Sequence, residues 1–160
     1  MFVECIEVLK EIGVNTVIDI GSGTGFFPYL VNTSSEINCF GIEPRNNLVL
    51  SSNDFYSSNV MLEEKLLFCG NIKTFNEHIE NHNITIGCVT ILNFLHGNNH
   101  VSLEIEKLFS ILNKITNYII ISEPQNISTS PFVRIRDIGA NNQHGLYTNL
   151  NHPLNNKVKE

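Results

Sequence analysis

The sequence has few charged residues and no apolar run long enough to cross a membrane. Only 16% of its 160 residues are Asp, Glu, Lys or Arg, and 42% are hydrophobic. This composition argues against disorder along the whole chain, and the length suffices for one buried core. The longest apolar run, Tyr118 to Ile121, has the length of a strand, whereas a membrane helix needs about 20 residues. The start lacks a basic segment and carries Glu4 and Glu7 within its apolar stretch, which is not typical of a secretory signal.

Positive charge and paired cysteines are also scarce. The net charge of −6 argues against broad capture of nucleic acid, and leaves open a basic protein partner or a neutral small molecule. Cys5, Cys39, Cys69 and Cys88 stand far apart with no Cys-x-x-Cys pair, which argues against a zinc site. Two of them lie in apolar, strand-like runs, which favours buried thiols in a reducing compartment. We therefore expect an intracellular protein, cytoplasmic or nuclear, that does not bind membranes.

Helical and strand-like patterns alternate along most of the chain. Helical spacing is found at 2–12, 26–31, 46–55, 72–79 and 101–112, and strand-like runs at 16–20, 38–42, 66–69, 86–92 and 117–122. Such alternation predicts an α/β three-layer sandwich with a mainly parallel, Rossmann-like sheet. Beyond it, residues 132–138 alternate as an edge strand does, and 145–150 could pair with them in an antiparallel hairpin. We expect one domain over residues 1–150 and a disordered tail over 151–160.

A glycine-rich turn follows the first predicted strand. The run from Val17 to Phe27 reads Val-Ile-Asp-Ile-Gly-Ser-Gly-Thr-Gly-Phe-Phe. Glycine lets the backbone turn sharply and lets a ligand approach closely, while the start of the next helix presents unpaired N–H groups. Asp19, two residues before the first glycine, can meet the ammonium group of a ligand. An ordinary tight turn is the alternative to a ligand-binding loop.

The spacing of the glycines separates two kinds of nucleotide site. Gly21, Gly23 and Gly25 form Gly-x-Gly-x-Gly, and Phe26 stands where a dinucleotide fold places its third glycine, so the pattern disfavours NAD. Glu43 ends the second predicted strand, where a carboxylate can accept both ribose hydroxyls of an adenosine. A surface carboxylate at a strand end is the alternative for Glu43.

These two motifs, Asp-Ile-Gly-Ser-Gly-Thr-Gly at 19–25 and Glu43, resemble those of class I S-adenosylmethionine-dependent methyltransferases. The resemblance covers about residues 15–125 and implies S-adenosyl-L-methionine as the cofactor. It implies that Asp19, Gly21, Ser22, Gly23 and Gly25 face the methionine end and that Glu43 faces the ribose. Asn71 stands where such enzymes often place an acidic residue near the adenine, and it can accept a hydrogen bond from the ring's amino group. A plain turn residue is an equal alternative for Asn71.

The end of the fourth predicted strand marks the expected acceptor side. Asn93, Phe94 and His96 follow that strand, and together with Gly21 they are our candidates for lining the methyl acceptor. Asn93 can also hold the cofactor's methionine end, Phe94 can exclude water and His96 can act as a base. A surface loop histidine is the favoured reading of His96. No metal site is expected here.

One resemblance bears on the acceptor. Asn-Phe-x-x-Gly at 93–97, with Asp-Ile-Gly-Ser-Gly and Gly-Ile-Glu, resembles the disruptor-of-telomeric-silencing histone lysine methyltransferases and implies a protein lysine. The chain departs from that family because it has no long helical N-terminal region and no basic tail. A cofactor-binding but inactive partner subunit is the alternative to an active methyltransferase, and a nicotinamide-dependent oxidoreductase is disfavoured by the glycine spacing.

Overall fold

The computed structural model describes residues 2–60, 65–82, 86–92, 102–122, 131–139 and 144–149. Its helices are α1 (Phe2–Glu11), α2 (Phe26–Ser34), α3 (Asn46–Val60), α4 (Ile72–His82) and α5 (Ser102–Ile115). Its strands are β1 (Thr16–Ile20), β2 (Asn38–Glu43), β3 (Leu67–Cys69), β4 (Ile86–Ile91), β5 (Thr116–Ser122), β6 (Phe132–Ile138) and β7 (His144–Asn149). Each of these elements was predicted from periodicity, with bounds that differ by a few residues.

The strands form one sheet in the order β3-β2-β1-β4-β5-β7-β6. The first five strands in this order run parallel, and β7 is antiparallel to both β5 and β6. The predicted mainly parallel sheet with a final antiparallel hairpin is therefore confirmed. The strand order changes direction between β1 and β4, and in open α/β sheets the crevice at such a switch is where ligands bind.

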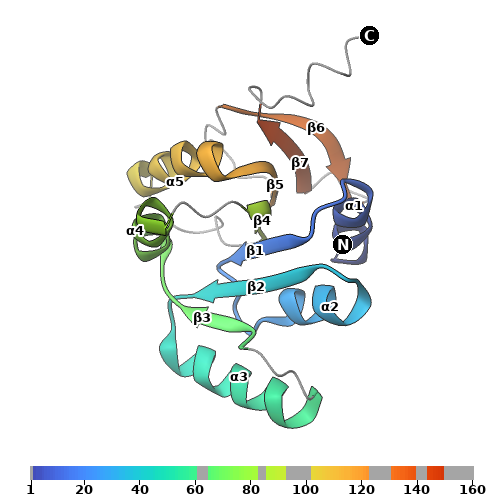
Figure 1. Cartoon of the computed structure of the whole chain (residues 1–160), viewed down its shortest axis with the longest axis vertical. Coiled ribbons are helices and arrows are strands. Elements are labelled where there is room, and N and C mark those ends of the chain that lie inside the picture. The colour runs from blue at the N-terminus through green and yellow to red at the C-terminus, as the bar shows by residue number, and fades with distance from the viewer. Residues whose placement is uncertain are drawn as a thin grey trace.

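Helices cover both faces of the sheet and create two cores (Figure 1). On one face, α4 and α5 pack against each other and against the sheet, with Phe109, Leu112 and Ile119 fully buried or nearly so. On the other face, α1 and α2 bury Leu9 and Val31. Successive side chains of a strand point to opposite faces of the sheet, which is why β5 has three isoleucines in a row: Ile119 and Ile121 enter one core and Ile120 the other.

The free edges of the sheet are held by specific polar contacts. Asn53 of α3 donates to the carbonyl of Leu67 and accepts from its N–H, both at 2.9 Å, and so occupies the outer edge of β3. At the opposite edge, Arg136 of β6 forms an ion pair with Glu11 of α1, and Figure 1 shows β6 ending beside that helix. The Asn53 amide thus takes up backbone groups of β3 that another chain could otherwise pair with, and the ion pair of Arg136 joins β6 to α1.

Several features predicted from the sequence are confirmed, and others cannot be compared. Cys5, Cys39 and Cys88 are buried free thiols, as predicted for the last two, and burial raises the pKa of Cys5 to about 12. No helix among the described residues is long and apolar enough to span a membrane. Asn93, Phe94, His96 and the tail at 151–160 lie outside the described residues.

Candidate functional site

The glycine loop connects β1 to α2 and depends on left-handed backbone. Gly21, Gly23 and Gly25 have φ values of 76°, 60° and 75°, a region that side chains with a Cβ rarely adopt. The N–H groups of Gly21 and Ser22 both donate to the carbonyl of Ile42, at 2.9 and 3.1 Å. The loop is therefore anchored over the end of β2 and lies at the carboxyl edge of the sheet.

The glycines of this region have different structural roles. A Cβ at Gly23 would meet no atom of the described residues within 4 Å, whereas one at Gly25 would lie 2.9 Å from the Leu67 side chain. A Cβ at Gly41 of β2 would lie 2.3 Å from both Ser22 Oγ and Leu67 Cδ2. Gly25 and Gly41 thus permit close packing, while Gly23 borders open space that a ligand can fill.

Glu43 is the point where the glycine loop, β2 and β3 meet. Its side chain is only 3% exposed. Oε2 accepts from the N–H of Gly23 at 3.0 Å, and Oε1 accepts from the Arg45 N–H at 3.1 Å and from Arg45 Nε at 2.5 Å. The Glu43 carbonyl accepts from the N–H of Gly70 at 3.1 Å, which aligns the start of the next loop.

The ionisation of Glu43 follows from these bonds. Burial alone raises the pKa of this carboxyl, but hydrogen bonds from the Arg45 side chain, the Arg45 N–H and the Gly23 N–H outweigh it. Together with the charge of Arg45, they lower the pKa of Glu43 below its ordinary value. Glu43 is thus a buried acceptor that stays ionised near neutral pH.

Asp19 lies beneath the loop and is 3% exposed. Its Oδ1 accepts from Thr90 Oγ1 of β4 at 2.6 Å, across the β1–β4 boundary. Burial raises the pKa of Asp19 to about 7, against the opposing effect of the hydroxyls of Thr90 and Ser22. The carboxylate therefore connects the two strands at the switch point and sits on the α1–α2 side of the sheet, near Cys39.

Ser22 provides a test of whether the loop suits a polar ligand. Its Oγ is buried and forms no hydrogen bond of standard geometry within the described part of the chain, although it interacts with Asp19 and lowers the pKa of that carboxyl. Buried hydroxyls are normally paired, and an unpaired one often marks a place where a ligand or water completes the bonding. With the room beside Gly23 and the ionised Glu43, this hydroxyl fits the polar amino-acid and ribose groups of S-adenosylmethionine.

Asn71 begins α4 and caps it. Its Oδ1 accepts from the N–H of Thr74 at 3.0 Å, while its own N–H donates to Thr74 Oγ1 at 2.8 Å. This reciprocal pair satisfies N–H groups at the start of a helix. Asn71 therefore has a structural role, and its predicted contact with adenine remains a prediction.

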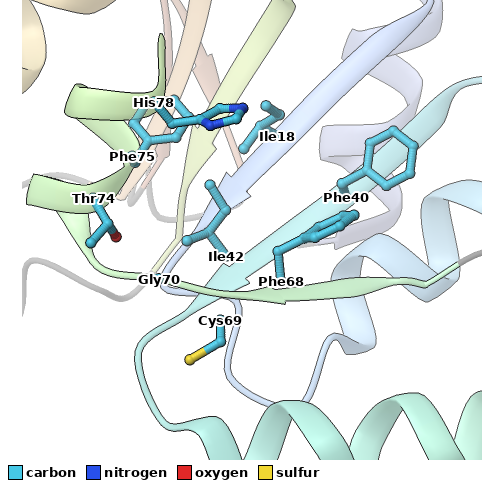
Figure 2. A pocket seen from close by; sticks show the side chains of 9 residues that line it. All are labelled: Ile18, Phe40, Ile42, Phe68, Cys69, Gly70, Thr74, Phe75 and His78. Atoms are coloured by element: carbon cyan, nitrogen blue, oxygen red, sulfur yellow. The ribbon is translucent and has the colours of Figure 1, made fainter. Parts of the chain in front are cut away.

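A cavity of about 420 Å³ lies under α4 and is lined in part by Ile18 and Ile42 of the sheet (Figure 2). Figure 2 shows Phe75 and His78 of α4 extending towards Ile18 and Ile42, with Phe40 and Phe68 nearby. None of its described lining residues belongs to the predicted site. Within the described ranges, no three His, Cys, Asp or Glu side chains gather as metal ligands.

Two residues of the site were missed by sequence reasoning. Thr90 bonds Asp19 from 71 positions away, and only the strand register brings them together. Arg45 stands two residues after Glu43, and an acidic residue followed closely by a basic one could have suggested their pairing. The structure brings Gly21, Gly23, Ser22 and Glu43 together, with Asn71 at the adjacent loop after β3.

The chain is similar in structure to several methyltransferases. No protein-family model matches it, and no curated protein matches its sequence significantly. It aligns with the methyltransferase domain of a bacterial Hen1 at 15% identity and a TM-score of 0.63, over 92% of this chain and 96% of that one. An S-adenosylmethionine-dependent methyltransferase from Clostridium acetobutylicum aligns at 16% identity and 0.58, over 75% and 48%.

The bifunctional kinase-methyltransferase WbdD aligns at 16% identity, with a TM-score of 0.63. That alignment covers 92% of this chain but 40% of WbdD, so this chain spans about two fifths of the larger protein. At such identities the similarity concerns the fold. The sheet order, the antiparallel hairpin and these alignments show that the chain has the Rossmann-like fold of S-adenosylmethionine-dependent methyltransferases.

Proposed function

We propose that this chain binds S-adenosylmethionine at the carboxyl edge of β1 and β2 and transfers its methyl group to an acceptor. The observation that carries the proposal is the left-handed glycine loop, anchored on β2 and bonded through Gly23 to the buried carboxylate of Glu43. The fold and the Gly-x-Gly-x-Gly spacing support the same cofactor over NAD.

The residues of this chain would divide the work of holding the cofactor. Glu43 would accept hydrogen bonds from the ribose hydroxyls, and the glycine loop would permit close approach of the amino-acid end. Asp19 is buried beneath the glycine loop and bonded to Thr90, and it would hold the loop in position. S-adenosylmethionine supplies a methyl group on a good leaving group, so the protein's main task is alignment and exclusion of water.

For the acceptor, we propose the edge beyond β4, with Gly21 and with Asn93, Phe94 and His96, which follow β4 in the sequence. Gly21 directly follows β1, which is adjacent to β4, and this supports the proposal, whereas the other three lie outside the described residues. A protein lysine is the acceptor class that we propose on the Asn-Phe-x-x-Gly resemblance alone.

The test is transfer of a labelled methyl group from S-adenosylmethionine by the purified chain. Acceptors would be a fractionated cell extract and lysine-containing peptides, with Gly23→Ala as the matched inactive control. Label in protein that survives acid hydrolysis as methyl-lysine supports the lysine proposal, and label elsewhere refutes it. Binding without transfer to any fraction would favour an inactive partner subunit, and absence of binding would overturn the proposed function.

A further inference from the structure

Arg45 lies against the carboxylate that the proposed function assigns to ribose. Its guanidinium is joined to Glu43 Oε1 through Nε at 2.5 Å, although the Arg45 side chain is 65% exposed. The Arg45 N–H donates to the same oxygen at 3.1 Å, while Gly23 N–H holds Oε2 at 3.0 Å. Three donors therefore bond one buried carboxylate. Two of them are backbone N–H groups, and the third is the long, largely exposed side chain of Arg45.

A count of acceptor sites shows a conflict with ribose binding. A carboxylate offers about four lone-pair sites, two on each oxygen. Both sites of Oε1 are taken by Arg45, and one site of Oε2 is taken by Gly23. Within the part of the chain that the structure describes, one acceptor site of Glu43 therefore remains, whereas two ribose hydroxyls need two. The backbone donors belong to the fixed loop and strand end, so the guanidinium is the group that can leave.

We propose, resting on the proposed function, that Arg45 is an affinity-setting residue that occupies one ribose acceptor position of Glu43 and is displaced by the cofactor. The bond between Arg45 Nε and Glu43 Oε1 exists in the free protein and is lost when both hydroxyls bind. An interaction made only in the free state opposes binding by its own free energy. Arg45 therefore weakens binding of a cofactor that carries both hydroxyls, and it reduces the difference in affinity between that cofactor and one that lacks a hydroxyl.

Loss of the Arg45 side chain leaves the rest of the site in place. The Arg45 N–H still donates to Oε1, because that bond involves only backbone of residue 45. The next turn is also unaffected, since the Arg45 carbonyl accepts from the N–H of Val49 through backbone alone. Arg45→Met keeps the length and apolar stem of the side chain and removes only the donors and the charge.

The experiment measures the dissociation constant of S-adenosylhomocysteine by calorimetry for the wild type, Arg45→Met, Arg45→Lys and Lys114→Met. The last variant removes an exposed positive charge from α5 and is the matched control. Exposed ion pairs contribute little, so we expect Arg45→Met to bind about threefold more tightly, Arg45→Lys to lie between, and the control to match the wild type. Added salt screens the ion pair and should reduce the difference between the dissociation constants of the wild type and Arg45→Met.

A second readout uses analogues of S-adenosylhomocysteine that lack the ribose 2′- or 3′-hydroxyl. In the wild type, Arg45 can stay bonded to Glu43 when the analogue lacks the hydroxyl that would replace it. For that analogue, the loss of affinity relative to S-adenosylhomocysteine should therefore be smaller in the wild type than in Arg45→Met. Equal or weaker binding of folded Arg45→Met, with equal losses for both analogues, would overturn the proposal. If the wild type fails to bind S-adenosylhomocysteine at all, the proposed function itself fails, before any variant is compared.

Discussion

At Glu43, donors from three backbone and side-chain positions meet one buried carboxylate, and the proposed ribose contact depends on it. Glu43→Gln keeps the size of the side chain but loses the charge and one acceptor. We expect binding of S-adenosylhomocysteine to weaken by about 1.5–3 kcal/mol, the range for hydrogen bonds to a charged group. Calorimetry measures this, with the exposed Glu36→Gln as control. A change below about twofold in the folded variant would contradict the assignment of Glu43 to ribose.

The raised pKa of Asp19 should give the protein a pH dependence of stability that is opposite in sign to that from a paired surface carboxylate. Its pKa in the folded protein is raised by burial to about 7 from 3.8. Between these values the folded state keeps a proton that the unfolded state has released, so stability falls as the pH rises through this window. The slope from this one group reaches at most about 1.4 kcal/mol per pH unit.

Asp19→Asn removes that titration. Urea unfolding of wild type and variant between pH 4 and 8 should show that the wild type loses stability relative to the variant as the pH rises. Parallel pH profiles for the two proteins would show that Asp19 is not a protonated group in the folded state. Glu43 acts in the other direction, because its lowered pKa gives stability that is lost only as the pH falls below its ordinary value of 4.5.

At the scale of elements, asparagine side chains join helices to strands. Asn32 of α2 donates to the Cys39 carbonyl at 2.6 Å and accepts from its N–H at 3.1 Å, and Asn53 makes the same pair of bonds to Leu67. Each amide thus makes with one residue of β2 or β3 the two backbone hydrogen bonds that a neighbouring strand would make. Composition alone could not reveal this use, because it depends on which face of the helix the asparagine occupies.

Variants at the start of α4 can distinguish a capping role of Asn71 from a ligand-binding role. Thr74→Ala and Asn71→Ala each remove half of the reciprocal cap, and each should destabilise the protein by about 1 kcal/mol in urea unfolding. If Asn71 also contacts adenine, only Asn71→Ala should weaken binding of S-adenosylhomocysteine. Equal binding by both variants would limit Asn71 to the cap.

At the scale of the whole molecule, the sequence predicted the layers and the element order because apolar periodicity records which faces are buried. The edge position of β6 and its hairpin with β7 also followed from local pattern. The neighbour order β5-β7-β6 did not, because strand pairing depends on long-range contacts that no local pattern records.

The site was predicted in part for the same reason. The glycine loop and Glu43 are adjacent to strand ends, so local sequence identified them. The contacts that set their properties come from elsewhere: Thr90 reaches Asp19 from β4, and Gly41 makes room for Ser22 and Leu67. A glycine inside a strand reads as a weak strand former, and only the assembled sheet shows that a side chain there would collide with the loop.

The central claim is that the glycine loop and Glu43 form a site for S-adenosylmethionine. Its most direct test is calorimetry of the purified chain with S-adenosylmethionine and NAD side by side, repeated with Gly23→Ala. No atom of the described residues lies within 4 Å of a Cβ placed at Gly23, so a methyl group there would enter the ligand's space, while its positive φ adds strain of about 1–2 kcal/mol. We expect saturable binding of S-adenosylmethionine, no binding of NAD, and loss of binding in Gly23→Ala with the circular dichroism of the folded chain retained. Binding of NAD in place of S-adenosylmethionine, or unchanged affinity in the folded variant, would contradict the account.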